Sequence, residues 1–106
     1  MNIVAREILL GLWKVHILHH ASREPVVGLW MLKELRRHGY EVSPGTLYPL
    51  LKRMERNGWL RCNVPRNAGP RARRGYTLTR QGRAVLARVR RQVDELGREL
   101  AEGDAA

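Results

Sequence analysis

The stretch Ser43 to Gly58, SPGTLYPLLKRMERNG, decides how the rest of the chain is interpreted. Its apolar residues recur at intervals of three and four, which is typical of one buried face of an α-helix. Ser43 is a favourable N-cap whose hydroxyl can accept a free backbone N–H, and Pro44 suits the first helical position. Asn57 and Gly58 tolerate positive φ, so the predicted helix ends there. The residues predicted to be buried are Leu47, Leu50, Leu51 and Met54.

The opposite face of this predicted helix is small, hydroxyl-bearing or basic. Hydroxyl groups and basic side chains can bond to phosphates and base edges, and a helix N-terminus itself attracts phosphate. Such a helix suits a DNA major groove; an ordinary amphipathic helix with a solvated basic face is the alternative. Pro49 removes a backbone hydrogen bond, so we expect an irregular first turn. This face carries Gly45, Thr46, Tyr48, Lys52, Arg53 and Arg56.

The segments that follow favour the DNA-binding interpretation. Residues 59–64 (WLRCNV) alternate apolar and polar side chains, which predicts a half-buried strand. Residues 65–74 (PRNAGPRARR) form a turn-rich loop with four arginines, and residues 75–79 (GYTLT) predict a second short strand. A helix, a strand, a basic loop and a second strand, in this order, are the layout of a winged helix.

At this point the sequence resembles the PadR family of transcriptional regulators. The resemblance covers roughly positions 5–100 and implies a mostly α fold with a small β-hairpin wing. It predicts a winged helix-turn-helix DNA-binding domain over residues 1–79 and a long C-terminal dimerisation helix with a tail over 80–106. A chain that ends at Ala106 resembles the short class of the family. The matching residues are Ser43-Pro44-Gly45-Thr46-Leu47-Tyr48-Pro49-Leu50-Leu51, Arg53-Met54-Glu55, Gly58-Trp59-Leu60, Tyr76-Thr77-Leu78-Thr79 and Gly82.

Composition points to a polyanionic partner. The 106 residues form one predicted domain with a net charge of +10. Residues 61–91 hold ten arginines and no acid, whereas residues 94–104 hold five acids and one arginine. A uniformly basic, solvated surface would not show this break. It indicates a half of the molecule that faces nucleic acid and a distal end turned away from it.

Several classes of protein are disfavoured. The one cysteine, Cys62, cannot form a disulfide within the chain and is expected to be a small core residue, which fits a reducing cytoplasm. Charges at Arg6, Glu7 and Lys14 interrupt the N-terminal apolar run, so no signal peptide is predicted. No stretch approaches the ~20 apolar residues of a membrane span. We therefore expect a cytoplasmic protein. The sequence also shows no paired carboxylates, no nucleophile motif and no phosphate-cradling glycine loop, so we expect that it is not an enzyme.

Two helices are predicted ahead of residue 43. The first, residues 2–20, is apolar nearly all round, which implies burial on several sides and hence a partner subunit. The second, residues 26–38, should turn Leu29, Leu32 and Leu35 toward the core and end at Gly39 in a left-handed C-cap. Together with residues 43–57 it makes a helix-turn-helix, in which the later helix reads the groove. Gly28 matches the family, whereas Leu29 replaces the tyrosine that the family usually has there.

The last helix, residues 80–102, follows a plausible N-cap at Thr79. Its apolar residues are spaced three and four apart, which is a heptad seam of only about two repeats. Such a seam is too short to be stable alone in water. We therefore expect a homodimer formed by the first and last helices, as the resemblance also implies. The predicted interface residues are Leu9, Trp13, Leu86, Val89, Val93, Leu96 and Leu100.

Histidines and tryptophans raise two further possibilities. His16, His19 and His20 have the spacing of a partial zinc site, but no cysteine or carboxylate set near them in the sequence completes it. Favourable interaction with the helix dipole is the expected role, so no metal or cofactor is predicted. Trp13 and Trp30 could line a cavity for a small-molecule effector of the kind that the resemblance implies, although core packing is the favoured role.

The leading hypothesis is a homodimeric transcriptional regulator that binds an inverted-repeat operator in double-stranded DNA. Repressor activity is implied by the resemblance alone. A protein–protein adaptor on a winged-helix scaffold is the alternative, and it would not bind DNA specifically. Ser43 and Gly45 are predicted to position the helix N-terminus. Base or phosphate contacts are predicted for Thr46, Tyr48, Lys52 and Arg53, and wing contacts for Arg71, Arg73 and Arg74. The predicted DNA-binding residues are Ser43, Gly45, Thr46, Tyr48, Lys52, Arg53, Arg71, Arg73 and Arg74.

Overall fold

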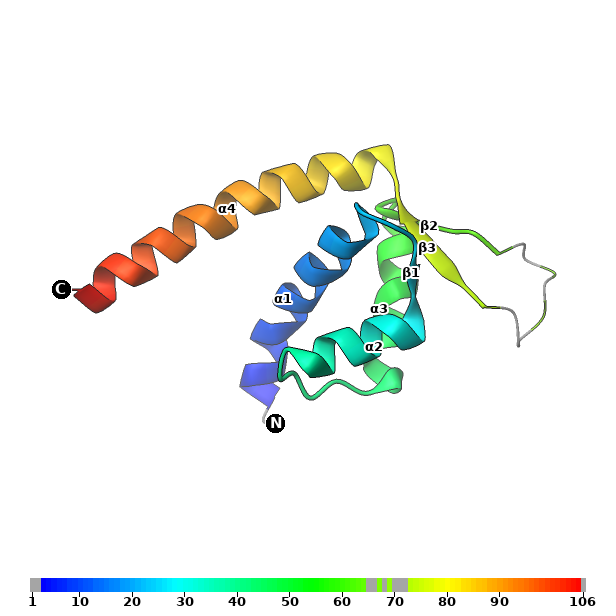
Figure 1. Ribbon diagram of the computed structural model, residues 1–106, viewed down its shortest axis with the longest axis horizontal. Helices are drawn as coiled ribbons and strands as arrows, with labels where there is room; N and C mark the ends of the chain where they lie inside the picture. Colours follow the sequence, from blue (N-terminus) through cyan, green and yellow to red (C-terminus); the bar gives the residue numbers. More distant parts are fainter. Residues whose placement is uncertain (1–2, 65–66, 68, 70–72, 106) are drawn as a thin grey trace.

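In a computed structural model, the chain folds into helices packed around a small antiparallel sheet, with one long helix extending from the body (Figure 1). The structure describes residues 3–64, 67, 69 and 73–105. The sheet has the strand order β1-β3-β2. The described elements are α1 (Ile3–Ala21), β1 (Val26–Val27), α2 (Gly28–Arg37), α3 (Pro44–Arg56), β2 (Leu60–Cys62), β3 (Gly75–Leu78) and α4 (Arg80–Ala105).

The sheet contains one strand that the sequence did not predict. Val26 and Val27 form β1 and pair antiparallel with Tyr76 and Gly75 of β3. The predicted start of the second helix at Val26 is therefore wrong, because two β-branched residues fit a pleated edge better than a helix start. The two predicted strands are confirmed, with Cys62 half-buried opposite Tyr76.

The apolar face of α3 is buried as predicted. Leu47 and Met54 are 0% exposed, and Leu51 is 1% exposed. In α2 the buried positions are Gly28, Met31, Leu32 and Leu35, which recur at i, i+3, i+4 and i+7. The prediction that Leu29 points toward the core is wrong. It lies outside this buried face and is 54% exposed.

Two predictions about the start of α3 are also wrong. The Ser43 hydroxyl does not cap the helix and donates instead to Thr46 Oγ1 at 3.3 Å, while the Ser43 carbonyl accepts the backbone N–H of Leu47 at 3.0 Å. The helix also runs through Pro49 without a break. The predicted left-handed ends are confirmed, with φ of 93° at Gly39 and 83° at Gly58.

The start of α4 is tied to the end of α3. Thr79 is the N-cap as predicted, because its Oγ1 accepts the Gly82 backbone N–H at 2.9 Å. The same hydroxyl donates to the Gly58 carbonyl. A Cβ on Gly82 would lie 2.2 Å from the Trp59 carbonyl oxygen, so only glycine allows this close approach. These contacts hold the first turn of α4 against the body.

Beyond its first turns, α4 leaves the body, and it forms the long arm in Figure 1. Leu86 is 7% exposed, whereas Val93, Leu96 and Leu100 are 44%, 53% and 61% exposed. The N-terminal half of α1 likewise exposes Val4, Ile8 and Leu12. Large parts of both apolar faces are therefore uncovered within one chain.

The C-terminal half of α1 belongs to the core. Trp13 is 1% exposed, so its predicted place in an intersubunit interface is wrong: a second chain has almost no surface of this side chain to cover. Leu9 and Val89 are half-buried and keep surface that a partner could contact. No described helix is long and apolar enough to cross a membrane.

Candidate nucleic-acid interface

The outer surface of α3 follows from how its inner face is packed. Because Leu47, Leu51 and Met54 fix the rotation of the helix, the residues on its opposite side point outward. Gly45, Lys52 and Arg53 are exposed, as is Ser43 just before the helix. The exposed fraction of Tyr48 is 41%. The sequence therefore predicted the outward face of this helix correctly.

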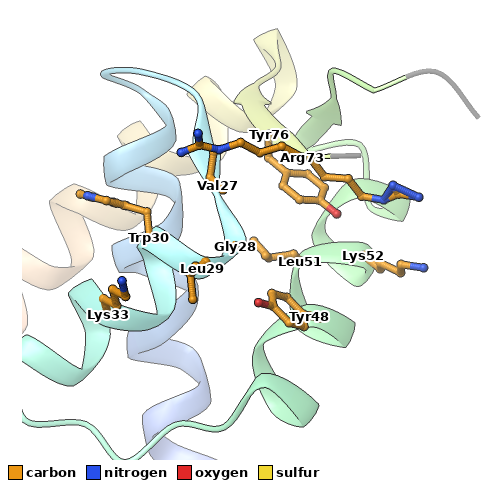
Figure 2. Close-up of a pocket in the computed structure, with 11 residues that line it drawn as sticks. Val27, Gly28, Leu29, Trp30, Lys33, Tyr48, Leu51, Lys52, Arg73 and Tyr76 are labelled. Atoms are coloured by element: carbon orange, nitrogen blue, oxygen red, sulfur yellow. The ribbon is translucent and has the colours of Figure 1, made fainter. Parts of the chain in front are cut away.

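A cavity of about 690 Å³ lies between α3, the start of α2 and the base of the wing. Figure 2 shows its lining side chains, with Tyr48 and Lys52 on α3 and Arg73 on the strand side. Four of the lining residues carry a positive charge, and none carries a carboxylate. The lining residues are Val27, Gly28, Leu29, Trp30, Lys33, Tyr48, Leu51, Lys52, Arg73, Arg74 and Tyr76.

Tyr48 is positioned by the start of α2. A Cβ on Gly28 would lie 2.5 Å from Tyr48 Cε1, so the aromatic ring rests directly against the glycine backbone. A side chain at position 28 would have to displace the ring. The close approach gives Gly28 a physical role, which is to leave room for the Tyr48 ring beside the cavity.

Thr46 is placed differently from the other predicted contact residues. It is half-buried, and its Oγ1 accepts a hydrogen bond from Arg6 Nη2 of α1 at 3.2 Å as well as one from Ser43. Sequence reasoning missed Arg6, because a contact across 40 positions leaves no local pattern. The Thr46 hydroxyl therefore links α1 to the start of α3.

The base of the wing is well defined. Asn63 N–H donates to the Gly75 carbonyl at 2.8 Å, which continues the pairing of β2 and β3 by one step. Arg73 is exposed and Arg74 is half-buried, and both line the cavity. Arg71, the third predicted wing contact, lies outside the described residues. The structure thus brings two of the predicted wing arginines beside Tyr48 and Lys52.

Six cavity residues were not predicted as site residues: Val27, Gly28, Leu29, Lys33, Leu51 and Tyr76. Lys33 lies one turn after Leu29 on the exposed face of α2, and its spacing could have indicated a basic surface there. Tyr76 is buried on β3, and burial raises the pKa of its phenol, so the hydroxyl stays protonated at neutral pH. Val27 was not identified because it was predicted to lie inside the second helix.

The two tryptophans that were predicted as a possible ligand pocket are in different places. Trp30 lines the cavity and is 43% exposed, and its ring meets His20 edge-on at 5.1 Å. Trp13 lies in the core with its ring 6.0 Å from Tyr40, and it does not line this cavity. The predicted pairing of Trp13 with Trp30 is therefore wrong for this cavity, whereas the predicted core packing of Trp13 is confirmed.

Comparison with known proteins is consistent across sequence and structure. The sequence profile of the transcriptional regulator PadR-like family matches residues 17–88. Transcriptional regulator Rv3488 of Mycobacterium tuberculosis H37Rv is 48% identical over 100 residues, which cover 94% of this chain and 92% of that protein.

Solved structures give the same result. A PadR-like transcriptional regulator from Bacillus cereus has a TM-score of 0.78 at 28% identity, over 91% of this chain and 94% of that chain. A PadR-like transcription factor from Bacteroides fragilis has a TM-score of 0.75 at 26% identity, over 95% and 98% of the two chains. The fold expected from the sequence, a winged helix-turn-helix with a long C-terminal helix, is confirmed.

Proposed function

The chain belongs to the transcriptional regulator PadR-like family, and we propose that it binds operator DNA as a homodimer and acts as a repressor. The observation that carries this proposal is the basic cavity between α3 and the wing. It combines four cationic side chains, an exposed tyrosine and a helix start in one concave surface. Repression itself is inferred from the family resemblance.

A DNA backbone phosphate fits the chemistry of the cavity. Lys52 of α3 and Arg73 and Arg74 of the wing base all line the cavity, and no carboxylate among the lining residues opposes an anion. Val27 and Gly28 place the N-terminus of α2 at the same surface, where free backbone N–H groups favour negative charge. The Tyr48 hydroxyl adds a neutral donor. We assign these groups to phosphate contacts that fix the position of α3 on the duplex.

The remaining exposed residues of α3 are assigned to the major groove. A Cβ on Gly45 would have only the Ser43 hydroxyl within 4 Å, so the first turn has open space around it and can approach a base closely. Arg53 is exposed and does not line the cavity, which leaves it free of the proposed phosphate site and suited to a guanine edge. Thr46 can contact DNA by donating its hydroxyl proton, because the hydrogen bonds from Arg6 and Ser43 occupy both lone pairs of its oxygen. Arg71 is assigned to the wing on sequence grounds.

Dimerisation is proposed from the uncovered apolar faces. Leu96 and Leu100 of α4 and Ile8 of α1 are each more than half exposed in one chain, which is costly for a surface of this extent. A second copy of the same chain can cover them through a two-fold axis, with the α4 seam of each chain packed beside α1 of the other. Leu9 and Val89, which are half-buried, extend that interface toward the body, whereas the predicted interface residue Leu86 is only 7% exposed and packs in the core of its own chain. A two-fold dimer would present its two α3 helices to half-sites about 34 Å apart, one turn of DNA.

A small molecule that releases the repressor is proposed on the family resemblance. Trp30 supports it, because its exposed ring lies at the edge of the DNA-facing cavity. A planar compound stacked there would occupy the space assigned to a phosphate. Quenching of Trp30 fluorescence together with loss of DNA binding would support this part of the proposal. Quenching without loss of DNA binding would contradict it.

DNA binding is tested by fluorescence anisotropy with a labelled duplex from upstream of the protein's own gene and a scrambled duplex of equal length. At about 0.15 M salt, purely electrostatic binding is weakened. We expect the upstream duplex to bind ~10³-fold more tightly or better, as sequence-specific regulators do. Equal, weak binding to this duplex and to a wider set of genomic duplexes would contradict the proposal and favour an adaptor that uses the basic face for an acidic protein.

A further inference from the structure

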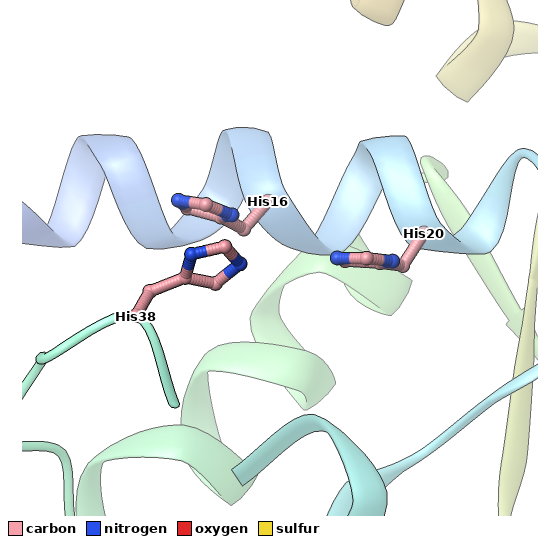
Figure 3. A group of neighbouring side chains, drawn as sticks. All are labelled: His16, His20 and His38. Atoms are coloured by element: carbon pink, nitrogen blue, oxygen red, sulfur yellow. The ribbon is translucent and has the colours of Figure 1, made fainter. Parts of the chain in front are cut away.

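Three histidines from two helical segments meet on the side of α1. His16 and His20 are four residues apart, so they project from the same face of this helix. His38 is the C-cap residue of α2 and faces them across the gap (Figure 3). One ring nitrogen from each of His16, His20 and His38 lies within 4.8 Å of the others. The cluster differs from the sequence-based set because His38 replaces His19.

A carboxylate lies beside this cluster. Glu34 Oε2 is 3.4 Å from His20 Nε2 and 3.2 Å from His38 Nε2. Arg37 donates to both carboxylate oxygens at 2.9 Å and, with the histidines, lowers the pKa of Glu34 to about 2, so this group is ionised at neutral pH. The expectation that no carboxylate completes the histidine set is therefore wrong, since α2 supplies one from outside the local sequence.

We propose that His16, His20 and His38 bind one divalent transition-metal ion of the zinc class, with the Glu34 carboxylate as the fourth ligand. Imidazole nitrogen and carboxylate oxygen are ordinary zinc ligands at about 2.0–2.1 Å, which separates tetrahedral ligand atoms by about 3.4 Å. The two histidine–carboxylate distances already match that separation. The His38 side chain is 36% exposed and can rotate to bring the three nitrogens closer.

The surroundings of the cluster suit a bound cation, which would take the place of the contacts between the histidines and Glu34. Burial, followed by repulsion from neighbouring histidines, lowers the pKa of both His16 and His20. Neutral imidazole is the form that binds metal. Tyr40 Oη lies 3.4 Å from His16 Nε2 and can orient this ring. Such an outer partner is what metal-bound histidines commonly have.

A metal ion in this cluster would connect parts of the chain with different roles. It would join α1, which contributes to the proposed dimer interface, to the segment that leads from α2 into α3. His20 also contacts the ring of Trp30, which lines the DNA-facing cavity. The bound ion would therefore hold the helix-turn-helix in a fixed position relative to α1. It would also change the surroundings of the Trp30 ring, because His20 contacts this ring.

The proposal is tested by titrating the full chain, without an affinity tag and freed of metal by a chelator, with Co²⁺ and then with Zn²⁺. We expect the visible d–d absorption of four-coordinate Co²⁺ to saturate at one ion per chain and to disappear when Zn²⁺ competes. Isothermal titration calorimetry then gives the Zn²⁺ affinity. His38→Gln and His16→Gln should each weaken this affinity by at least ~10–100-fold, and Glu34→Gln should weaken it less.

His19→Gln is the matched control, because His19 is the neighbouring histidine of α1 that lies outside the cluster. We expect it, like Cys62→Ser, to bind as the unaltered chain does. No saturable Co²⁺ band, or equal affinity in the unaltered chain and His38→Gln, would overturn the proposal. Circular dichroism checks that each variant is folded, and exposed His38 tolerates substitution best. The titrations contain no DNA, so failure here leaves the proposed DNA binding untouched.

Discussion

The two amphipathic helices α3 and α4 have equally regular apolar faces but different surroundings. In α3 the four predicted apolar residues are at most 4% exposed, because α1, α2 and the sheet cover them. In α4 the seam is buried at Leu86 and half-buried at Val89, and its last three members are 44% to 61% exposed. The comparison shows that periodicity predicts that a face will be covered but not whether the same chain covers it.

The difference follows from how each helix is attached. The body holds α3 on several sides, whereas α4 is held at its N-terminal end by Thr79 and Gly82. A helix of 26 residues is about 39 Å long, so most of α4 extends beyond the body. The molecule is accordingly elongated, with extents of 56 × 31 × 20 Å. We infer that α3 stabilises the fold of one chain and that α4 joins two chains.

The strongest test of this difference is a charge in the buried face. Leu47→Asp places an unpaired carboxylate at a position that is 0% exposed, which has a cost of several kcal/mol. We expect the chain to be unfolded, at every protein concentration, by circular dichroism and thermal melting. A folded Leu47→Asp variant would contradict the account of the core.

The same substitution in the seam should have a different result. Leu96→Asp removes ~1.5–3 kcal/mol of apolar burial per chain, or twice that per dimer, so we expect a dimer at least ~100-fold weaker. The monomer should keep its helical spectrum. Sedimentation equilibrium measures the change. A dimer as stable as that of the unaltered chain would show that α4 is not the interface.

Two glycines of α4 sharpen the contrast between its attached and free ends. Gly82→Ala would bring a Cβ to 2.2 Å from the Trp59 carbonyl, so we expect a loss of about 3 kcal/mol in unfolding free energy. Gly97 has no heavy atom within 4 Å of a Cβ, and Gly97→Ala should stabilise the helix by about 0.5–1 kcal/mol. Urea denaturation measures both, and destabilisation by Gly97→Ala would show that position 97 itself is packed against another part of the protein.

The outer face of α3 is tested by Tyr48→Ala. We expect operator affinity to fall by ~1–3 kcal/mol with no change in the dimer, because the ring packs on Gly28 beside the proposed phosphate site. Anisotropy titration measures the loss. Tyr48→Phe keeps the ring and separates the contribution of the hydroxyl. Unchanged affinity of Tyr48→Ala would remove this residue from the interface.

The smallest expected effect is in the wing. Arg73→Ala should weaken binding to all duplexes similarly and reduce the slope of log affinity against log salt by about one, since one phosphate contact is lost. The matched control is Arg98→Ala, an exposed arginine on the acidic end of α4, which should leave the slope unchanged. A loss confined to one sequence would assign Arg73 to base recognition.

Local patterns predicted most of the fold. Spacing predicted the buried face of α3, Thr79 as an N-cap and the left-handed glycines, because each depends on neighbours within about one helical turn. The wrong predictions depended on distant residues. Val26 is a strand residue only because β3 lies beside it, and Leu29 is exposed because α2 packs on the body through Gly28, Met31, Leu32 and Leu35.

The candidate sites show the same limit. The sequence predicted the basic face of α3 and the wing arginines, since both are concentrated in one stretch. It did not predict that Arg6 would bond to Thr46, or that Glu34 and His38 would meet His16 and His20, because these contacts join separate helices. Burial of Trp13 was likewise decided by the packing of α1, and its apolar character alone did not distinguish a core position from an interface.

The central claim is that α4 pairs two chains so that two α3 helices read one operator. It is tested most directly by titrating the unaltered chain and Leu96→Asp against a full upstream duplex and a duplex cut to one half-site. We expect the unaltered chain to bind the full duplex at least ~100-fold more tightly than the half-site, and Leu96→Asp to bind both with the same weak affinity. If Leu96→Asp keeps the full-duplex affinity of the unaltered chain, α4 does not organise DNA binding and the account is wrong.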